Sequence, residues 1–421
     1  MDVVLMIVCG TLMLSFLVLI HEGGHYLAAR AFGVRVTELM LGMPGPNIGF
    51  KRGATKFGVT PILLGGYAKV CGMEPGEMSP HLEPVLASVY RRGTAHIEDV
   101  ASDCGISVDE AEAALEELVE WGSVIEPQKK DQFNTYRTPE YRPTKRDFKR
   151  AAKAVAGMTA SASATATANG AGGPSAADSA AAPEGALGSD PASGPSAAAA
   201  AVAAPAAPRA FALGEPREVL DAHALFESEY RQQYRSLPFW KRSVILVAGV
   251  TVNLLFAIVA FVIIYSIIGI DYQNTQTGEV THFNANPLQA IQAGFVYIGM
   301  VIQAVAGLFN PATAAQTVSQ SSSIVGIVVM SKDAFAMGFT NALFFTAAIS
   351  VSLGIMNLIP IPPLDGGRFA IEVFQRISRR TVSARALNAL SMAGMALFLG
   401  FFVFMVNQDV QRLIAGTFFG Q

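Results

Sequence analysis

Long apolar segments limit this chain to folds that lie in a membrane. The first covers residues 3–32, and the others cover residues 243–270, 341–363 and 387–406. Each can cross a hydrocarbon core of about 30 Å, because an α-helix rises about 1.5 Å per residue. The composition agrees, with 51% hydrophobic and 15% charged residues and a mean hydropathy of +0.38. We therefore predict a polytopic α-helical membrane protein with four transmembrane helices.

Features near the N-terminus and the cysteines limit this class further. The residues before the first apolar segment, Met1 and Asp2, carry no positive charge, so a cleaved signal peptide is not expected. The three cysteines, Cys9, Cys71 and Cys104, are widely spaced, and we expect no disulfide framework. The net charge of −3 is close to neutral and indicates no particular class of partner.

The polar pentapeptide HEGGH at residues 21–25 interrupts the first apolar segment. On a helix, His21 and His25 lie one turn apart on the same face, where their imidazoles can hold one Zn²⁺. Glu22 can then act as the general base that takes a proton from the attacking water. Ionisable residues are costly inside a membrane segment, so this group predicts a function and a further ligand elsewhere in the chain.

Lysine and arginine residues set the orientation of the apolar segments. They lie near the membrane ends of the region between the first two segments and again after the third, whereas residues 271–287 contain none. The positive-inside rule therefore predicts a cytosolic first loop, an N-terminus outside, and a third segment that ends inside. We expect the apolar residues 288–309 to lie at the outer interface, since one additional crossing would invert every later segment. The alternative is a crossing paired with residues 324–337.

The same topology indicates the third metal ligand. The sequence LDGGR at residues 364–368 follows the cytosolic end of the third segment, and HEGGH lies toward the cytosolic end of the first. Asp365 can therefore complete a site with His21 and His25, leaving one tetrahedral position open, as catalytic zinc requires. The alternative for Asp365 is a turn carboxylate before glycines.

Together these sequences resemble the site-2 proteases, intramembrane zinc metalloproteases that cut transmembrane segments of other proteins. The matching blocks occur in order: LIHEGGHYLAAR at 19–30, ILLGGYAKVCGMEPGE at 62–77, AGVTVN at 248–253 and NLIPIPPLDGGR at 357–368. The resemblance covers most of residues 1–77 and 237–406. It implies a zinc-dependent endopeptidase of a bacterial cell membrane, with its active site near the cytosolic face. The implied reaction is hydrolysis within or near transmembrane segments of single-pass proteins, such as anti-sigma factors or other regulators, in regulated intramembrane proteolysis.

The resemblance also implies roles for individual residues. The positions that match the family's zinc ligands and general base are His21, His25, Asp365 and Glu22. Asn253 and Asn357 match polar residues that hold the substrate backbone or the oxyanion, with amide bonding between helices as an equal alternative. Residues 56–72 match a membrane-associated β-hairpin in which Gly65 and Gly66 lie beside an unwound substrate strand. A plain cytosolic loop with a Gly-Gly turn is the alternative there.

The chain also departs from the family pattern. Val250 stands where relatives usually have proline, and Ser352 stands where many have asparagine. The PDZ modules that often follow the second segment have no room between Asp271 and the third segment. We therefore expect no substrate filtering by PDZ modules on the outer side.

A cytosolic insert at residues 78–150 is predicted to be a small α+β winged-helix-like domain. Helices are expected at residues 82–92, 96–103 and 107–121, followed by a two-stranded wing at 123–138. Ser107 and Glu110 form a capping box for the third helix. Residues 94–126 contain ten acidic residues but no lysine or arginine, so phosphates would be repelled and no nucleic acid is expected. We predict a module that binds a cytosolic regulatory protein or ligand.

The remaining segments complete a four-part organisation of residues 1–77, 78–150, 151–214 and 215–421. Residues 151–214 are rich in Ala, Ser, Gly and Pro and predict a disordered linker. Residues 218–234 predict a short amphipathic helix, and the sequence SLPFWKR at 236–242 suits an anchor at the lipid bilayer surface. Two other functions fit the same residues: a transporter or ion pathway that uses the intramembrane His, Glu and Asp cluster, and a catalytically dead membrane-anchored sensor.

Overall fold

The computed structural model describes residues 2–63, 65–73, 78–128, 131, 134–143, 145, 148–149, 152, 209–273, 280–380 and 382–415. They divide into two compact units, residues 1–137 with 216–421 and residues 138–215. Most of the linker predicted at residues 151–214 lies outside the described residues. The elements named below belong to the larger unit, in which all three cysteines are free, as expected.

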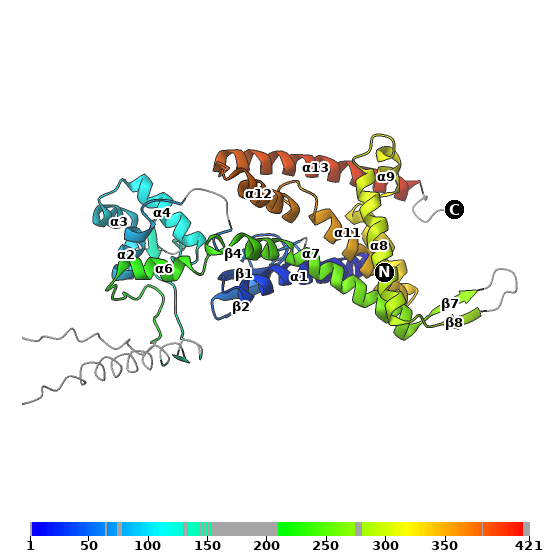
Figure 1. Ribbon diagram of the computed structural model, residues 1–421, viewed down its shortest axis with the longest axis horizontal. Coiled ribbons are helices and arrows are strands. Elements are labelled where there is room, and N and C mark those ends of the chain that lie inside the picture. Colours follow the sequence, from blue (N-terminus) through cyan, green and yellow to red (C-terminus); the bar gives the residue numbers. More distant parts are fainter. Residues whose placement is uncertain are drawn as a thin grey trace, which may run out of the picture. The chain divides into compact units, whose positions relative to one another are not determined.

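Five helices in the described part of the chain are long and apolar enough to cross a membrane (Figure 1). They are α1 (Asp2–Ala31), α7 (Phe239–Val262), α8 (Pro287–Gly307), α11 (Phe339–Asn357) and α13 (Ala384–Ile414). A π-helical stretch, η2 (Ile263–Ile268), continues α7. The prediction of a multi-pass α-helical membrane protein is confirmed, but the count of four spans is not, because α8 is a fifth candidate.

Helix α8 contains the apolar residues that we expected at the outer interface. It packs on α7 and α11 through a face that buries Ala290, Gly294 and Ile298. In Figure 1 it runs crosswise to α1 and α7. This direction suits a helix in the plane of the interface, and that position of α8 stays a prediction.

A four-stranded sheet follows α1. Its strands are β1 (Val36–Leu41), β2 (Ile48–Arg52), β3 (Thr55–Val59) and β4 (Gly66–Val70), in the order β2-β3-β1-β4. The predicted hairpin at residues 56–72 is wrong, because β3 and β4 do not pair with each other. Strand β1 lies between them, parallel to β3 and antiparallel to β4, and this central place buries its Val36 and Met40. Strand β4 forms one edge of the sheet, with β1 as its partner among the described strands.

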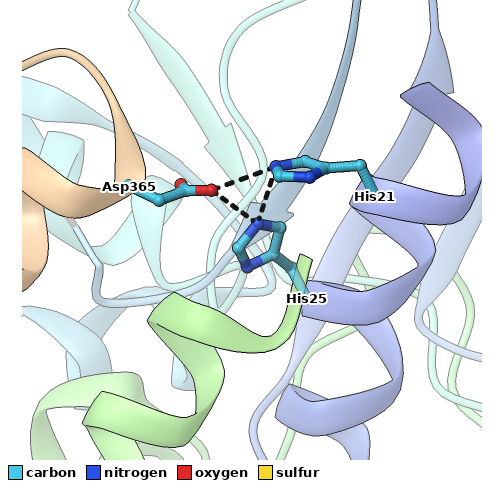
Figure 2. Close-up of side chains that lie close together, drawn as sticks. All are labelled: His21, His25 and Asp365. Carbon is cyan, nitrogen blue, oxygen red and sulfur yellow. Dashed lines mark hydrogen bonds and ion pairs between the residues drawn. The ribbon is translucent and has the colours of Figure 1, made fainter. Parts of the chain in front are cut away.

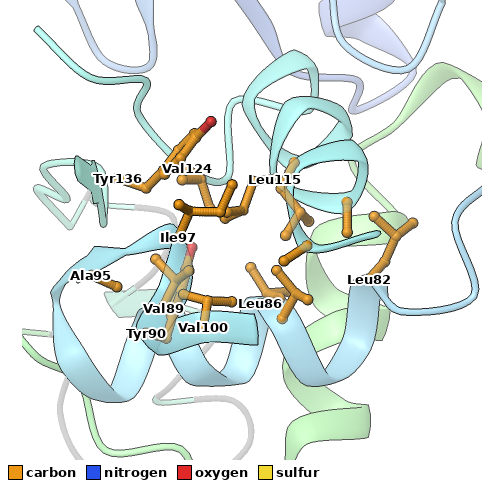
Figure 3. Close-up of a cluster of buried hydrophobic side chains, with 14 of the residues drawn as sticks. Leu82, Leu86, Val89, Tyr90, Ala95, Ile97, Val100, Leu115, Val124 and Tyr136 are labelled. Atoms are coloured by element: carbon orange, nitrogen blue, oxygen red, sulfur yellow. The ribbon is translucent and has the colours of Figure 1, made fainter. Parts of the chain in front are cut away.

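The insert contains the three predicted helices, each ending within one residue of its expected bounds. Its elements are α2 (Leu82–Arg92), β5 (Thr94–His96), α3 (Ile97–Cys104), α4 (Val108–Glu120) and β6 (Thr135–Arg137). Their apolar faces share one core, which includes Leu86, Ile97 and Leu115 (Figure 3). The capping box of Ser107 and Glu110 is present, which confirms that prediction.

In the region predicted as a two-stranded wing, β6 pairs with β5, and one bridge joins Ile125 to Arg137. The winged-helix identity of the insert therefore stays a prediction. The other elements of the larger unit are α6 (Ala222–Tyr230), η1 (Tyr234–Ser236), β7 (Ile270–Gln273), β8 (Val280–Phe283), α9 (Ala314–Gln320), α10 (Ile324–Ala336) and α12 (Asp365–Ser378).

Candidate metal centre and active site

Two helices bring three potential metal ligands together (Figure 2). His21 and His25 lie one turn apart on α1 and are buried, and Asp365 is the first residue of α12. The Asp365 Oδ2 atom lies 3.0 Å from Nε2 of His21 and 3.1 Å from Nε2 of His25. The three ligand atoms all lie within 4.8 Å of one another. The residues predicted as ligands from opposite ends of the chain thus meet at one point.

The hydrogen bond of His25 indicates what kind of ligand this histidine can be. Its Nδ1 donates a hydrogen bond to the main-chain carbonyl of Ile245 at 2.8 Å. In the neutral imidazole, Nε2 is then unprotonated and turns a lone pair toward Asp365 and toward Nε2 of His21, 3.3 Å away. A cation between these atoms removes the repulsion between electron-pair donors. Two imidazole nitrogens and one carboxylate oxygen are ligands of catalytic zinc, so the donor set fits that metal.

Asn253 of α7 contacts the Nδ1 atom of His21, whereas Asp365 contacts the Nε2 atom of the same ring. It is fully buried, and its amide nitrogen Nδ2 is 3.3 Å from Nδ1 of His21. Its Oδ1 is buried without a hydrogen-bond partner among the described residues. Turned by 180°, the amide would accept a hydrogen bond from Nδ1–H of His21, which leaves Nε2 for the metal. Asn253 therefore lies where its amide can orient a metal ligand, and Ser350 donates a 2.9 Å hydrogen bond to the main-chain carbonyl of Asn253.

Close packing of α7 on α1 depends on a glycine at the metal centre. A Cβ atom on Gly249 would lie 2.4 Å from Nε2 of His25 and 2.8 Å from Nε2 of His21. No side chain fits at that position without moving a ligand. This glycine precedes Val250, the residue that stands in place of the family's proline, and α7 continues through it as a regular helix.

A cavity of about 220 Å³ opens beside the ligands and contains most of the other predicted site residues. Its lining residues are Val18, His21, Glu22, Gly65, Gly66, Leu353, Asn357, Pro363, Leu364 and Asp365. Of the predicted substrate-binding residues, Gly65, Gly66 and Asn357 thus lie at the cavity and Asn253 does not. Glu22 is half-buried at the cavity wall, beside the ligand His21.

The edge of the sheet forms one wall of this cavity. A Cβ atom on Gly66 would lie 2.7 Å from Val18 Cγ1 and 3.5 Å from Glu22 Cγ. Strand β4 therefore lies directly against the residue predicted as the general base.

A second buried polar centre joins α6 and the insert to the chain that follows α1. The Arg35 guanidinium pairs with Glu229 at 2.8 Å, and Ser123 donates to the same carboxylate oxygen at 2.6 Å. Arg35 also donates to the carbonyl of Gly122 at 3.0 Å, and its own carbonyl accepts from the main-chain N–H of Cys71. No sequence pattern predicted this centre, because Arg35 resembles the other basic residues near a membrane end and nothing in the sequence pairs it with Glu229.

The protein combines helices long enough to span a membrane with two histidines and one aspartate that could hold a metal ion, and a glutamate lies beside them. This combination is typical of a metal-dependent peptidase. The chain belongs to peptidase family M50, whose sequence profile matches residues 9–401. This finding confirms the resemblance to site-2 proteases. Zinc is accordingly the metal of this protein, and His21, His25 and Asp365 form a group that could hold it.

Individual relatives agree with that assignment. A protein of Agrobacterium fabrum is 26% identical over 419 residues, which is 96% of this chain and 95% of the relative. A protein of Campylobacter jejuni is 40% identical over 98 residues, 23% of this chain and 27% of the relative. Both are named as candidate zinc metalloproteases. The zinc metalloprotease RasP of Shouchella clausii is 33% identical over 94 residues, 22% of each chain. The last two alignments thus span about a quarter of the relatives' length.

Proposed function

We propose that this protein is an intramembrane endopeptidase that hydrolyses peptide bonds within or near transmembrane segments of single-pass membrane proteins. The observation that carries the proposal is the cavity itself, where the metal ligands, Glu22 and the edge strand β4 of the described sheet meet among helices long enough to span a membrane. We further propose that the protein acts in regulated proteolysis of membrane-bound regulators in the plasma membrane. The N-terminus is then outside and the cavity faces the cytosolic side.

Strand addition explains how a helical substrate would become cleavable. The carbonyls of a helix are engaged in its own hydrogen bonds, so the segment must unwind before its backbone can be attacked. An unwound segment then needs new partners for its N–H and C=O groups. Strand β4 offers these at its outer edge, and its first residue Gly66 lies at the cavity.

The chain supplies the groups that hydrolysis requires. A bound zinc ion supplies Lewis acidity at the carbonyl under attack. The Glu22 carboxylate is placed to accept a proton from the attacking water and to pass it to the leaving amine. The amide of Asn357, which also lines the cavity, would donate a hydrogen bond to the oxygen that becomes negatively charged.

The insert is proposed to bind a cytosolic regulatory protein or ligand rather than nucleic acid. Its helix α4 (Val108–Glu120) carries five glutamates and one aspartate and no basic residue, which repels phosphates. The insert is also joined to the segment that follows α1 by the hydrogen bond from Arg35 to Gly122. A bound regulator would therefore act on a domain that is connected to α1.

The test is cleavage of a single-pass reporter by the purified full-length protein in lipid vesicles, compared with the Glu22→Gln variant. We expect Glu22→Gln to keep zinc and to lose cleavage by about 10²-fold to 10⁴-fold, the range for removal of a general base. Glu98→Gln, at an exposed position on α3, is the matched control and should cleave like the original protein. Unchanged cleavage in Glu22→Gln would refute the catalytic role. Ion flux without cleavage would favour the transporter, and zinc binding without cleavage in the original protein would favour the inactive sensor.

A further inference from the structure

The cavity beside the metal ligands has an apolar half that the hydrolytic chemistry does not use. Its apolar lining residues are Val18, Leu353, Pro363 and Leu364. Val18 lies one turn before Glu22 on the same face of α1, and Leu353 lies one turn before Asn357 on α11. Leu364 directly precedes the ligand Asp365. Helix α1, helix α11 and the residues that lead into α12 therefore each present both apolar and polar side chains to the same space.

None of these apolar side chains is sealed into the protein core. Val18, Leu353 and Leu364 are all partly exposed, so an entering group can reach them. Val18 also sets the depth of the space next to β4, because its Cγ1 lies 2.7 Å from the Cβ position of Gly66. Val18 thus packs against β4 at Gly66, and both residues line the cavity.

The geometry of an extended strand determines which substrate side chain can enter the apolar half of the cavity. Successive side chains of an extended segment point to opposite faces, and neighbouring strands lie about 4.8 Å apart. When a carbonyl of the bound segment faces Glu22 and Asn357, a side chain flanking that bond must lie against the adjacent lining. That lining consists of the apolar residues. A charged side chain there would lose its hydration without gaining a partner.

We propose that Val18, Leu353 and Leu364 form a specificity subsite for an aliphatic side chain next to the scissile bond. The inference rests on the proposed function and extends it to a substrate class: transmembrane segments that unwind with an aliphatic residue beside the bond to be cut. The subsite selects by size, because Val18 and Leu353 close it from two different helices.

The experiment uses the full-length protein with single-pass reporters that differ only at the residue flanking the cleavage site, once mass spectrometry has located that site. The residue is Ala, Leu, Phe or Asp. We expect the original protein to cut the Leu reporter at least about tenfold faster than the Asp reporter, as apolar pockets discriminate. Equal rates for the Leu and Asp reporters would overturn the subsite.

Variants then test the lining residues. Val18→Ala should raise the ratio of the Phe rate to the Ala rate by about tenfold, and Val18→Leu should lower it by a similar factor. Leu353→Ala enlarges the same space from the opposite helix and should shift the ratio in the direction of Val18→Ala. Val8→Ala and Val8→Leu, at an exposed position on the same helix, are the controls and should leave the ratio unchanged.

The outcomes separate the subsite from the proposed function. Cleavage at an unchanged Phe-to-Ala ratio in both Val18→Ala and Leu353→Ala overturns the subsite and leaves the peptidase intact. No cleavage of any reporter by the original protein, matching Glu22→Gln, overturns the proposed function and the subsite with it.

Discussion

One buried polar centre lies in the C-terminal half of α1 and another lies just after this helix, and the two balance charge in different ways. In the centre of Arg35 and Glu229, a cation meets an anion, and hydroxyl and carbonyl groups complete the hydrogen bonds. In the centre of His21, His25 and Asp365, two imidazole nitrogens and one carboxylate oxygen gather at one point, where they could hold a metal ion. The Arg35 centre pairs a cation with an anion of the same chain, whereas the histidine centre offers a set of ligands for a metal cation.

The difference shows that buried polar side chains can either stabilise the fold or serve a chemical function. A buried charge is tolerated when it is paired, and removing one partner leaves the other without compensation. The Arg35 centre therefore contributes to the joint between the insert, α6 and the region after α1. In the histidine centre, Ile245 and Asn253 contact the Nδ1 atoms of His25 and His21, so that the Nε2 atoms stay available for a metal.

The largest effect that separates the two centres should follow removal of zinc. A strong chelator should abolish reporter cleavage completely, and added zinc should restore it, because the proposed reaction needs the metal at the histidine centre. The fluorescence of Trp121, which is fully buried in the insert, should stay unchanged, because the Arg35 centre contains no metal ligand set. The measurement uses a Trp240→Phe background so that Trp121 is the only tryptophan. Loss of the Trp121 signal together with zinc would show that the centres are not independent.

The next effect should come from breaking the ion pair. Arg35→Met leaves Glu229 buried without its cation and should lower the free energy of unfolding by about 3–5 kcal/mol. The double variant Arg35→Met, Glu229→Leu removes both charges and should recover most of that loss. Denaturant unfolding followed by Trp121 fluorescence measures both. A loss below about 1 kcal/mol in Arg35→Met would mean that the pair behaves like an exposed one.

Acid should weaken the Arg35 centre. Burial alone would raise the pKa of Glu229, but Arg35 and the hydrogen bond from Ser123 hold it below the usual glutamate value. Because the folded pKa is lowered, the stabilisation is fully present above the unfolded pKa of about 4.3 and is lost as pH falls through the folded value. The free energy of unfolding should therefore fall more steeply below about pH 4 in the original protein than in Glu229→Gln. Parallel pH profiles would contradict this account.

The sequence predicted the apolar helices and the metal centre because both leave strong local signals. Long runs of apolar residues define α1, α7, α11 and α13, and HEGGH and LDGG carry their ligands at fixed places relative to those helices. The three helices of the insert were predictable for a similar reason, since turns and a capping box delimit them.

The features that could not be predicted from the sequence depend on contacts between segments that are distant in the chain. A strand at Val36–Leu41 was not recognised, and its place between β3 and β4 turned the expected hairpin into a larger sheet. Asn253 was predicted beside the substrate, but only the packing of α7 on α1 shows that it faces His21. The ion pair of Arg35 and Glu229 forms when α6 meets the end of α1, and neither residue carries a local sign of it.

The smallest effect should be confined to the insert. Ser107→Ala removes the side-chain cap of α4 and should lower the free energy of unfolding by about 1 kcal/mol. Reporter cleavage and zinc content should not change. Ser102→Ala, at an exposed position on α3, is the control. A loss of zinc in Ser107→Ala would mean that the insert and the metal centre are coupled more tightly than the comparison allows.

The zinc content of the purified protein tests the contrast between the two centres most directly. We predict one zinc per chain in the original protein and in Glu229→Gln, which alters only the Arg35 centre. Asp365→Asn, which removes one ligand charge from the histidine centre, should lose most of its zinc, whereas Asp271→Asn at an exposed site should keep it. Full zinc occupancy in Asp365→Asn, or no zinc in the original protein, would contradict the assignment of the metal centre.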